Sequence, residues 1–160
     1  MNTLRKVLTW KRNNIIIVMI LLPLIPLNFY GVYADRFYFF KPTNYIFPLL
    51  TLVHFLYLYV LRFKITEGEL PDPKMRNLEY VVYGALLVYC FKIYDYAMVL
   101  HSISQFQGYI MPATSRPIAT IGLSLHCLLP IVTLVSFWYR KHLVGNYNFE
   151  NYNHNMNIWQ

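Results

Sequence analysis

The stretch that decides the fold is residues 81–101, VVYGALLVYCFKIYDYAMVLH. Residues 81–91 carry no charge, and Lys92 and Asp95 follow them. Eleven helical residues extend only about 16 Å, whereas the hydrocarbon core of a bilayer is about 30 Å thick. A helix that spans the bilayer here must therefore carry both charges into the apolar slab. A re-entrant hairpin would disturb the alternation of basic segments described below, so we favour a spanning helix over about 79–100.

The composition indicates the same class of protein. Of the 160 residues, 57% are hydrophobic and only 13% are charged, whereas soluble domains carry about 25% charged residues. Cys90 and Cys127 both lie in apolar runs, where cysteine is typically a small buried side chain. The chain therefore reads as an integral membrane protein without a disulfide framework.

Three further apolar runs have about the 20-residue length of a membrane helix, and they cover 15–33, 45–61 and 118–139. Aromatic residues near the ends of the runs are typical of membrane interfaces. The sequence predicts an all-α membrane protein, a four-helix transmembrane bundle with short loops. Its parts are a basic N-terminal segment over 1–14, a membrane domain over 15–139 and an asparagine- and aromatic-rich tail over 140–160.

The start of the chain also weakly resembles a cleavable signal. A basic segment and an apolar run precede residues 31–34, GVYA, whose Val32 and Ala34 fit the small-residue positions of a cleavage site. The apolar run is longer than the usual 7–15 residues of a signal core. We therefore expect a first membrane helix there, with cleavage as the alternative.

Basic residues predict the orientation of the four spans. Ten lysines and arginines fall in the N-terminal segment, in the loop over 62–78 and in the tail, against three in the two other connectors. Such an excess marks the cytosolic side, or the matrix side in a mitochondrion, so both termini should face it. The net charge of +7 is thus explained by orientation, and no basic stripe or motif indicates nucleic-acid binding.

Each predicted span carries at least one polar residue at a similar depth. Counting from the outer ends at 1.5 Å per residue places these groups roughly 7–14 Å below the outer surface. On the third span, Gly84, Val88, Lys92 and Asp95 share a helical face. We expect an intramembrane polar layer made of Asn28, Thr51, His54, Lys92, Asp95 and His126.

Four interpretations of this layer stay open. It could hold the helices together by interhelical hydrogen bonds, or form a proton or ligand pathway. His54 and His126 could ligate a haem axially or a metal. It could also line a pocket for a lipid or small ligand. The chain carries no catalytic motif such as a nucleophile elbow, GxGxxG or CxxC, so the sequence does not indicate an enzyme.

The sequence therefore favours an accessory, assembly or scaffold component of a membrane complex. The partners would be the bilayer and other membrane proteins, contacted through helix faces, the loop over 62–78 and the tail. Asparagine alternates with aromatic or apolar residues over 146–159, which fits disorder or a strand added to a partner. The endoplasmic reticulum or another endomembrane is the expected location, with the mitochondrial inner membrane as the alternative. The rival function is transport or redox chemistry at the polar layer.

Overall fold

A computed structural model describes residues 9–105 and 112–147. The prediction of an all-α four-helix bundle is confirmed, because the described residues form four helices long and apolar enough to cross a membrane. Most of the tail, and the first eight residues, lie outside the described part. The elements are α2 (Trp10–Phe29), β1 (Tyr30–Gly31), β2 (Arg36–Phe37), η1 (Pro42–Tyr45), α3 (Ile46–Glu67), α4 (Pro73–Gln105) and α5 (Ser115–Leu143).

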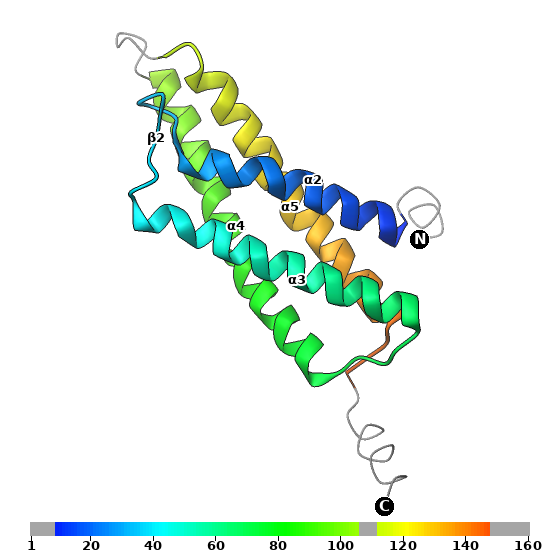
Figure 1. Ribbon diagram of the computed structural model, residues 1–160. Helices are drawn as coiled ribbons and strands as arrows, with labels where there is room; N and C mark the ends of the chain where they lie inside the picture. Colours follow the sequence, from blue (N-terminus) through cyan, green and yellow to red (C-terminus); the bar gives the residue numbers. More distant parts are fainter. Residues whose placement is uncertain (1–8, 106–111, 148–160) are drawn as a thin grey trace, which may run out of the picture.

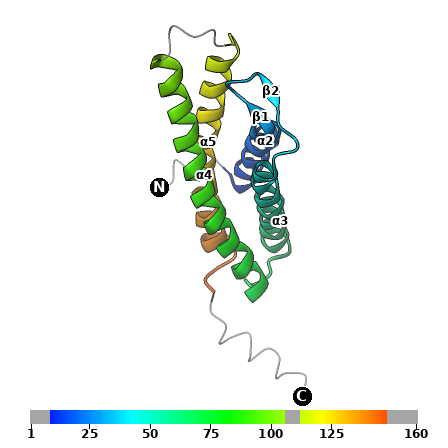
Figure 2. The same cartoon turned by 90° about the vertical axis from the view of Figure 1, so that its left-hand side faces the viewer.

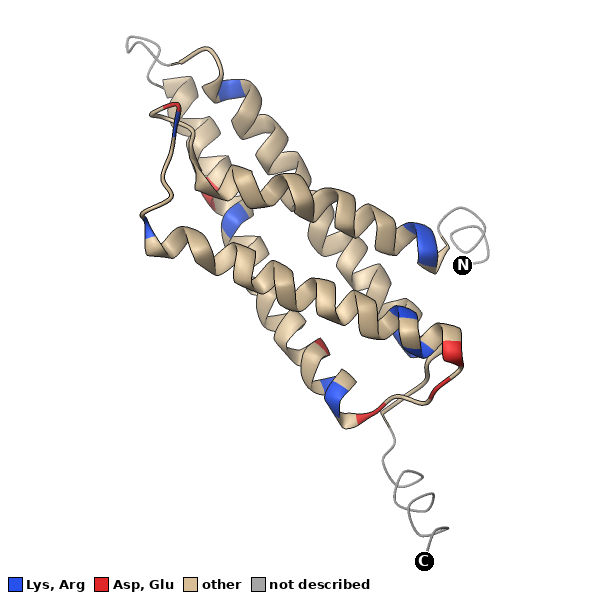
Figure 3. Cartoon of the chain, viewed as in Figure 1, with Lys and Arg blue, Asp and Glu red and all other residues tan. Residues whose placement is uncertain are grey.

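The four helices form two layers, with α2 beside α3 and α4 beside α5 (Figures 1 and 2). Consecutive helices run antiparallel, and α2 also packs against α5. One end of the bundle holds the start of α2, the α3–α4 loop and the end of α5. The other end holds the short β1–β2 hairpin, η1, the end of α4 and the start of α5. Charged residues gather mainly at these ends (Figure 3), although which side of a membrane each end faces stays a prediction.

The stretch 81–101 lies within one continuous helix, since α4 runs unbroken over 33 residues. That length corresponds to about 50 Å, more than the roughly 30 Å of the hydrocarbon core. Helix α4 must therefore tilt or project beyond the apolar slab. It continues to Gln105, the last described residue before the gap, beyond the predicted boundary near residue 100.

The loop before α4 is fixed by local chemistry. Gly68 ends α3 in the left-handed conformation, which glycine adopts without a steric cost. The Met75 amide donates a hydrogen bond to the Asp72 carboxylate at 2.7 Å, and the Lys64 ammonium lies 3.1 Å from that carboxylate. Partial burial acts to raise the pKa of Asp72, but these two partners hold that pKa below its usual value.

The buried face of α4 differs from the predicted stripe of Gly84, Val88, Lys92 and Asp95. Gly84 and Asp95 are exposed. The face of α4 that is buried instead carries several large side chains. Tyrosines occupy it because each buries a ring and still places its hydroxyl near a polar atom inside the bundle. The buried residues are Met75, Glu79, Val82, Ala85, Tyr89 and Tyr96.

A glycine lets α4 and α5 approach closely beside one of these tyrosines. A Cβ added to Gly122 would lie 2.4 Å from the ring of Tyr96, whereas a Cβ added to Gly84 meets nothing within 4 Å. The Tyr96 ring also packs against His126, with ring centroids 5.1 Å apart. The Tyr96 ring therefore cannot stay in place if residue 122 gains a side chain.

We predict that Gly122→Ala lowers the free energy of unfolding by about 1–3 kcal/mol, the usual cost of overpacking a core. The matched variant Gly84→Ala should not lower it, because alanine is the better helix former at an uncrowded site. Denaturant titration of both purified proteins in detergent measures the difference. Equal effects of the two substitutions would contradict the close approach at Gly122.

Candidate functional site

The six residues predicted to form one polar layer differ in burial and in surroundings. Thr51, His54 and His126 are buried in the interior of the bundle. The other three, Asn28, Lys92 and Asp95, lie around a pocket near the end of α2, beside the β1–β2 hairpin. Tyr96 lines this pocket and also packs against His126, with ring centroids 5.1 Å apart, so the pocket adjoins the interior residues.

In the interior, His54 on α3 pairs with Tyr89 on α4. The Tyr89 hydroxyl lies 3.1 Å from Nδ1 of His54, and the two rings are stacked with centroids 6.0 Å apart. The Nε2 atom of His54 is buried and has no hydrogen-bond partner among the described residues. A buried polar atom without a hydrogen bond costs free energy.

The two other interior residues bond to the backbone of their own helices. Nδ1 of His126 lies 2.8 Å from the Gly122 carbonyl oxygen, which fits an Nδ1–H that donates to it. The Thr51 hydroxyl donates to the Phe47 carbonyl at 2.9 Å. Both side chains are therefore satisfied within one helix and tie no two helices together by hydrogen bonds.

A continuous series of rings connects the two histidines. Tyr89 packs on His54, Phe47 lies 5.7 Å from Tyr89, and His126 lies 5.5 Å from Phe47, measured between ring centroids. Axial ligation of one haem requires both histidines to face a single macrocycle. His54 and His126 are 0% and 2% exposed and pack against Tyr89 and Phe47, so a haem held by both would require this ring packing to open. The described residues also include no group of three histidine, cysteine or carboxylate side chains placed to hold a metal ion.

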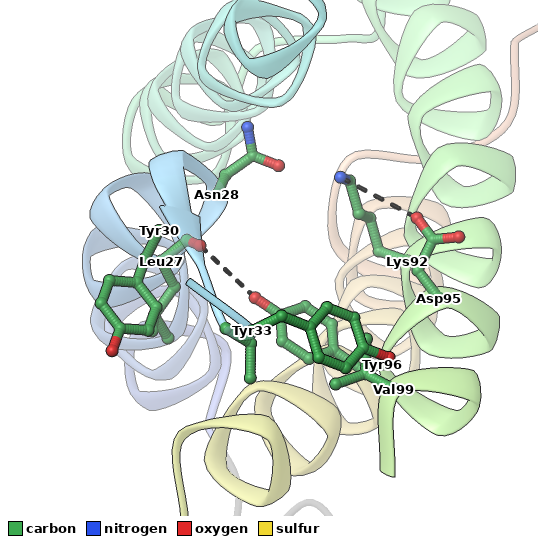
Figure 4. A pocket seen from close by; sticks show the side chains of 9 residues that line it. Leu27, Asn28, Tyr30, Tyr33, Lys92, Asp95, Tyr96 and Val99 are labelled. Atoms are coloured by element: carbon green, nitrogen blue, oxygen red, sulfur yellow. Dashed lines mark hydrogen bonds and ion pairs between the residues drawn. The ribbon is translucent and has the colours of Figure 1, made fainter. Parts of the chain in front are cut away.

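The pocket near the end of α2 has a volume of about 170 Å³ and is lined by α2, the residues that follow it, and α4. Lys92 and Asn28 point toward one another across it (Figure 4). The Lys92 ammonium lies 4.0 Å from the Asp95 carboxylate, and 29% of the Lys92 side chain is exposed against 62% for Asp95. This is the predicted i, i+3 pair, but it is loose and opens outward.

Asn28 has one satisfied and one free group in this pocket. Its amide nitrogen donates to the Asn44 carbonyl oxygen, while its Oδ1 atom is buried without a hydrogen-bond partner among the described residues. The pocket therefore offers an ammonium, a carboxylate and a free amide oxygen. Such a set can bind a small polar or zwitterionic group by hydrogen bonds and charge.

The sequence did not reveal a third polar cluster, at the opposite end of the bundle. Glu79 of α4 is 1% exposed, and its carboxylate faces Arg140 of α5. Nη2 of Arg140 donates to Oε1 at 2.7 Å, and Nε lies 2.7 Å from Oε2. This is a buried, two-pronged ion pair between neighbouring helices.

The same cluster holds the chain that leaves α5. The Tyr147 hydroxyl donates to Oε2 of Glu79, and the Arg140 guanidinium lies 4.3 Å from the centre of the Tyr147 ring. Arg140 also donates to the Gly145 carbonyl at 3.0 Å. Burial raises the pKa of Tyr147, and its bond to Glu79 raises it further, so the hydroxyl remains a donor at neutral pH.

Comparison with protein-family models, curated proteins and solved structures gave no match. The geometry of these polar clusters is therefore the basis for assigning a function.

We predict that Tyr89→Phe lowers the free energy of unfolding by about 1 kcal/mol, because it leaves His54 with two unsatisfied ring nitrogens. The substitution keeps the ring and its packing. Tyr94→Phe on the same helix is the matched control, since Tyr94 is exposed and should be neutral. Denaturant titration of both variants in detergent measures the effect, and an unchanged Tyr89→Phe variant would show that the His54 contact contributes nothing.

Proposed function

We propose that the chain is an accessory or scaffold component of a membrane complex. The observation that carries this proposal is the cluster of Glu79, Arg140 and Tyr147. It joins α4 to α5 and holds the residues that follow α5 against the bundle. A bundle that holds the residues after α5, as far as Tyr147, in a defined place is the arrangement expected of a docking component.

The energetics of the cluster support this role. A buried ion pair is often no more stabilising than apolar residues of the same volume, although removing one partner is costly. What such a pair provides is a defined geometry, because a guanidinium and a carboxylate meet in a fixed orientation. Here that geometry extends to Tyr147, the last residue that the structure describes. We infer that the cluster fixes the position of residues 144–147.

The proposal includes the partners and the location. Other membrane proteins would be contacted through the helix faces, the loop over 62–78 and the tail. The loop is held by Lys64, which lies 2.7 Å from Glu69 and 3.1 Å from Asp72, so it too can present a defined surface. The endoplasmic reticulum or another endomembrane is the proposed location, with the mitochondrial inner membrane as the alternative.

Removal of residues 148–160 should abolish cross-linking to the principal membrane partner in native membranes. Tyr147→Ala should weaken it as well, because the Glu79–Arg140 pair stays intact while the chain after α5 is released. The matched control is Asn146→Ala, which changes an exposed neighbour. Quantitative mass spectrometry of cross-linked membranes measures all three. An unchanged partner set after the truncation would overturn the docking role of the tail.

A second function, movement of a proton or small ligand, is favoured by the free Asn28 Oδ1 and His54 Nε2 atoms. Charged groups at membrane depth commonly mark ion or proton pathways. If Asp95 takes part, Asp95→Asn should abolish proton flux into liposomes that contain the protein, reported by an enclosed pH-sensitive dye. The free energy of unfolding should stay the same. An unaltered flux would exclude Asp95 from such a pathway, and an unfolded variant would favour a structural role.

A further inference from the structure

Helices α2 and α3 leave a groove between them on the surface of the bundle. One cavity of about 480 Å³ lies along the groove, and a second of about 350 Å³ lies at the end where α2 begins. The two share Asn14, Ile15 and Arg62, so they form one continuous groove. Of the four pairs of neighbouring helices, α2 and α3 make the least contact with each other. The groove lies in the space that this loose packing leaves.

The long part of the groove is apolar and open to the side. Met19 and Tyr59 are about two-thirds exposed along it, at 65% and 67%. These side chains face the hydrocarbon of the bilayer if the bundle spans it. The apolar lining comes mainly from Val18, Met19 and Leu22 of α2 and from Phe55, Leu58 and Tyr59 of α3.

The end part of the groove is polar and cationic. It is lined by Lys11, Arg62, Trp10, Asn14 and Thr66. Among residues 9–105 and 112–147, no carboxylate forms an ion pair with Lys11 or Arg62. Two cations at the mouth of an apolar groove, beside a tryptophan and two hydrogen-bonding side chains, complement an anionic head group.

The dimensions agree with one leaflet. From Trp10 to Leu22 the axis of α2 rises about 18 Å, and half of the hydrocarbon core is about 15 Å. An acyl chain that starts beside Arg62 would therefore reach the bilayer midplane close to the apolar end of the groove.

We propose that this groove is a binding site for an anionic phospholipid. Its phosphate lies between Lys11 and Arg62, and one acyl chain lies along the apolar part between α2 and α3. The site occupies one of the helix faces that the scaffold proposal offers to partners. It uses neither the Glu79 cluster nor the tail, so the lipid test and the truncation of residues 148–160 can fail separately.

A lipid suits the groove better than a helix of a second copy or of a partner. A packed helix would need a carboxylate at the depth of Lys11 and Arg62 and small residues against Met19 and Tyr59. In the turns before Glu67, α3 carries the large side chains of Leu56, Tyr59 and Phe63 rather than small residues. The other carboxylates on the described helices are Glu79 and Asp95. Of these, Glu79 is bound to Arg140 and Asp95 lies beside Lys92.

The test is native mass spectrometry of the full chain in a nonionic detergent with added phosphatidylserine, phosphatidylcholine or inorganic phosphate. Phosphatidylserine should bind in preference to the other two. Lys11→Gln and Arg62→Gln should each weaken its binding about fivefold, the effect expected of one cation at a membrane surface. Lys141→Gln is the matched control, because Lys141 is exposed at the same end of the bundle and outside the groove.

A second pair of variants tests the acyl chain. Met19→Trp should fill the groove and weaken phosphatidylserine binding at least about fivefold, as the loss of one cation does. Leu134→Trp places the same side chain at an exposed position on α5 and should leave phosphatidylserine binding unchanged. Equal losses from Lys141→Gln and Arg62→Gln would overturn the site, and so would an ineffective Met19→Trp. Saturation by inorganic phosphate alone would show an anion site without a lipid. Cross-linking of a cysteine at position 19 to a second protein chain would show that a helix fills the groove.

Discussion

The cost of placing charge in an apolar slab is the constraint on which the rest of the structure depends. A charged side chain at membrane depth needs a partner, a polar cavity or a path to the boundary. Glu79 and Arg140 meet the need with each other, across two helices. Lys92 meets it differently, at a pocket near the end of α2 with Asp95 and Asn28 nearby. The Glu79–Arg140 pair is buried, whereas Lys92 and Asp95 lie at a pocket and are partly exposed.

How much of this could be predicted follows from the range of each interaction. Span length alone required the charges of 81–101 to lie within a helix, and α4 is continuous there. The i, i+3 relation of Lys92 and Asp95 is also local and could be found in the sequence. The buried face of α4 could not be predicted from the sequence. Tyrosines and small residues are both candidates for that face, and the packing of α3 and α5 determines which of them is buried. Tyr89 is buried because His54 is there to meet its hydroxyl.

The predicted depths of the polar residues depend on the ends assumed for each apolar run. Counting residues from the end of each apolar run assumes that the helices end at one level. Helix α2 ends at Phe29, four residues before the end of its predicted span at residue 33, and α4 continues to Gln105, beyond the predicted end near residue 100. The Glu79–Arg140 pair could not be predicted from the sequence. Its members lie 61 positions apart, and only the register between two antiparallel helices brings them together.

The two layers of the bundle differ in how they close, and the difference follows from residue size. On α5, Gly122 lets Tyr96 of α4 pack against the helix backbone, so that seam is tight. Small residues at an interface have this effect in membrane bundles generally. Between α2 and α3, which make less contact, long side chains such as Met19, Phe55 and Tyr59 line an open groove. A bilayer fills any such space with lipid. The two basic residues at its mouth then determine which lipid is favoured, so the looser seam is also the one that can be selective.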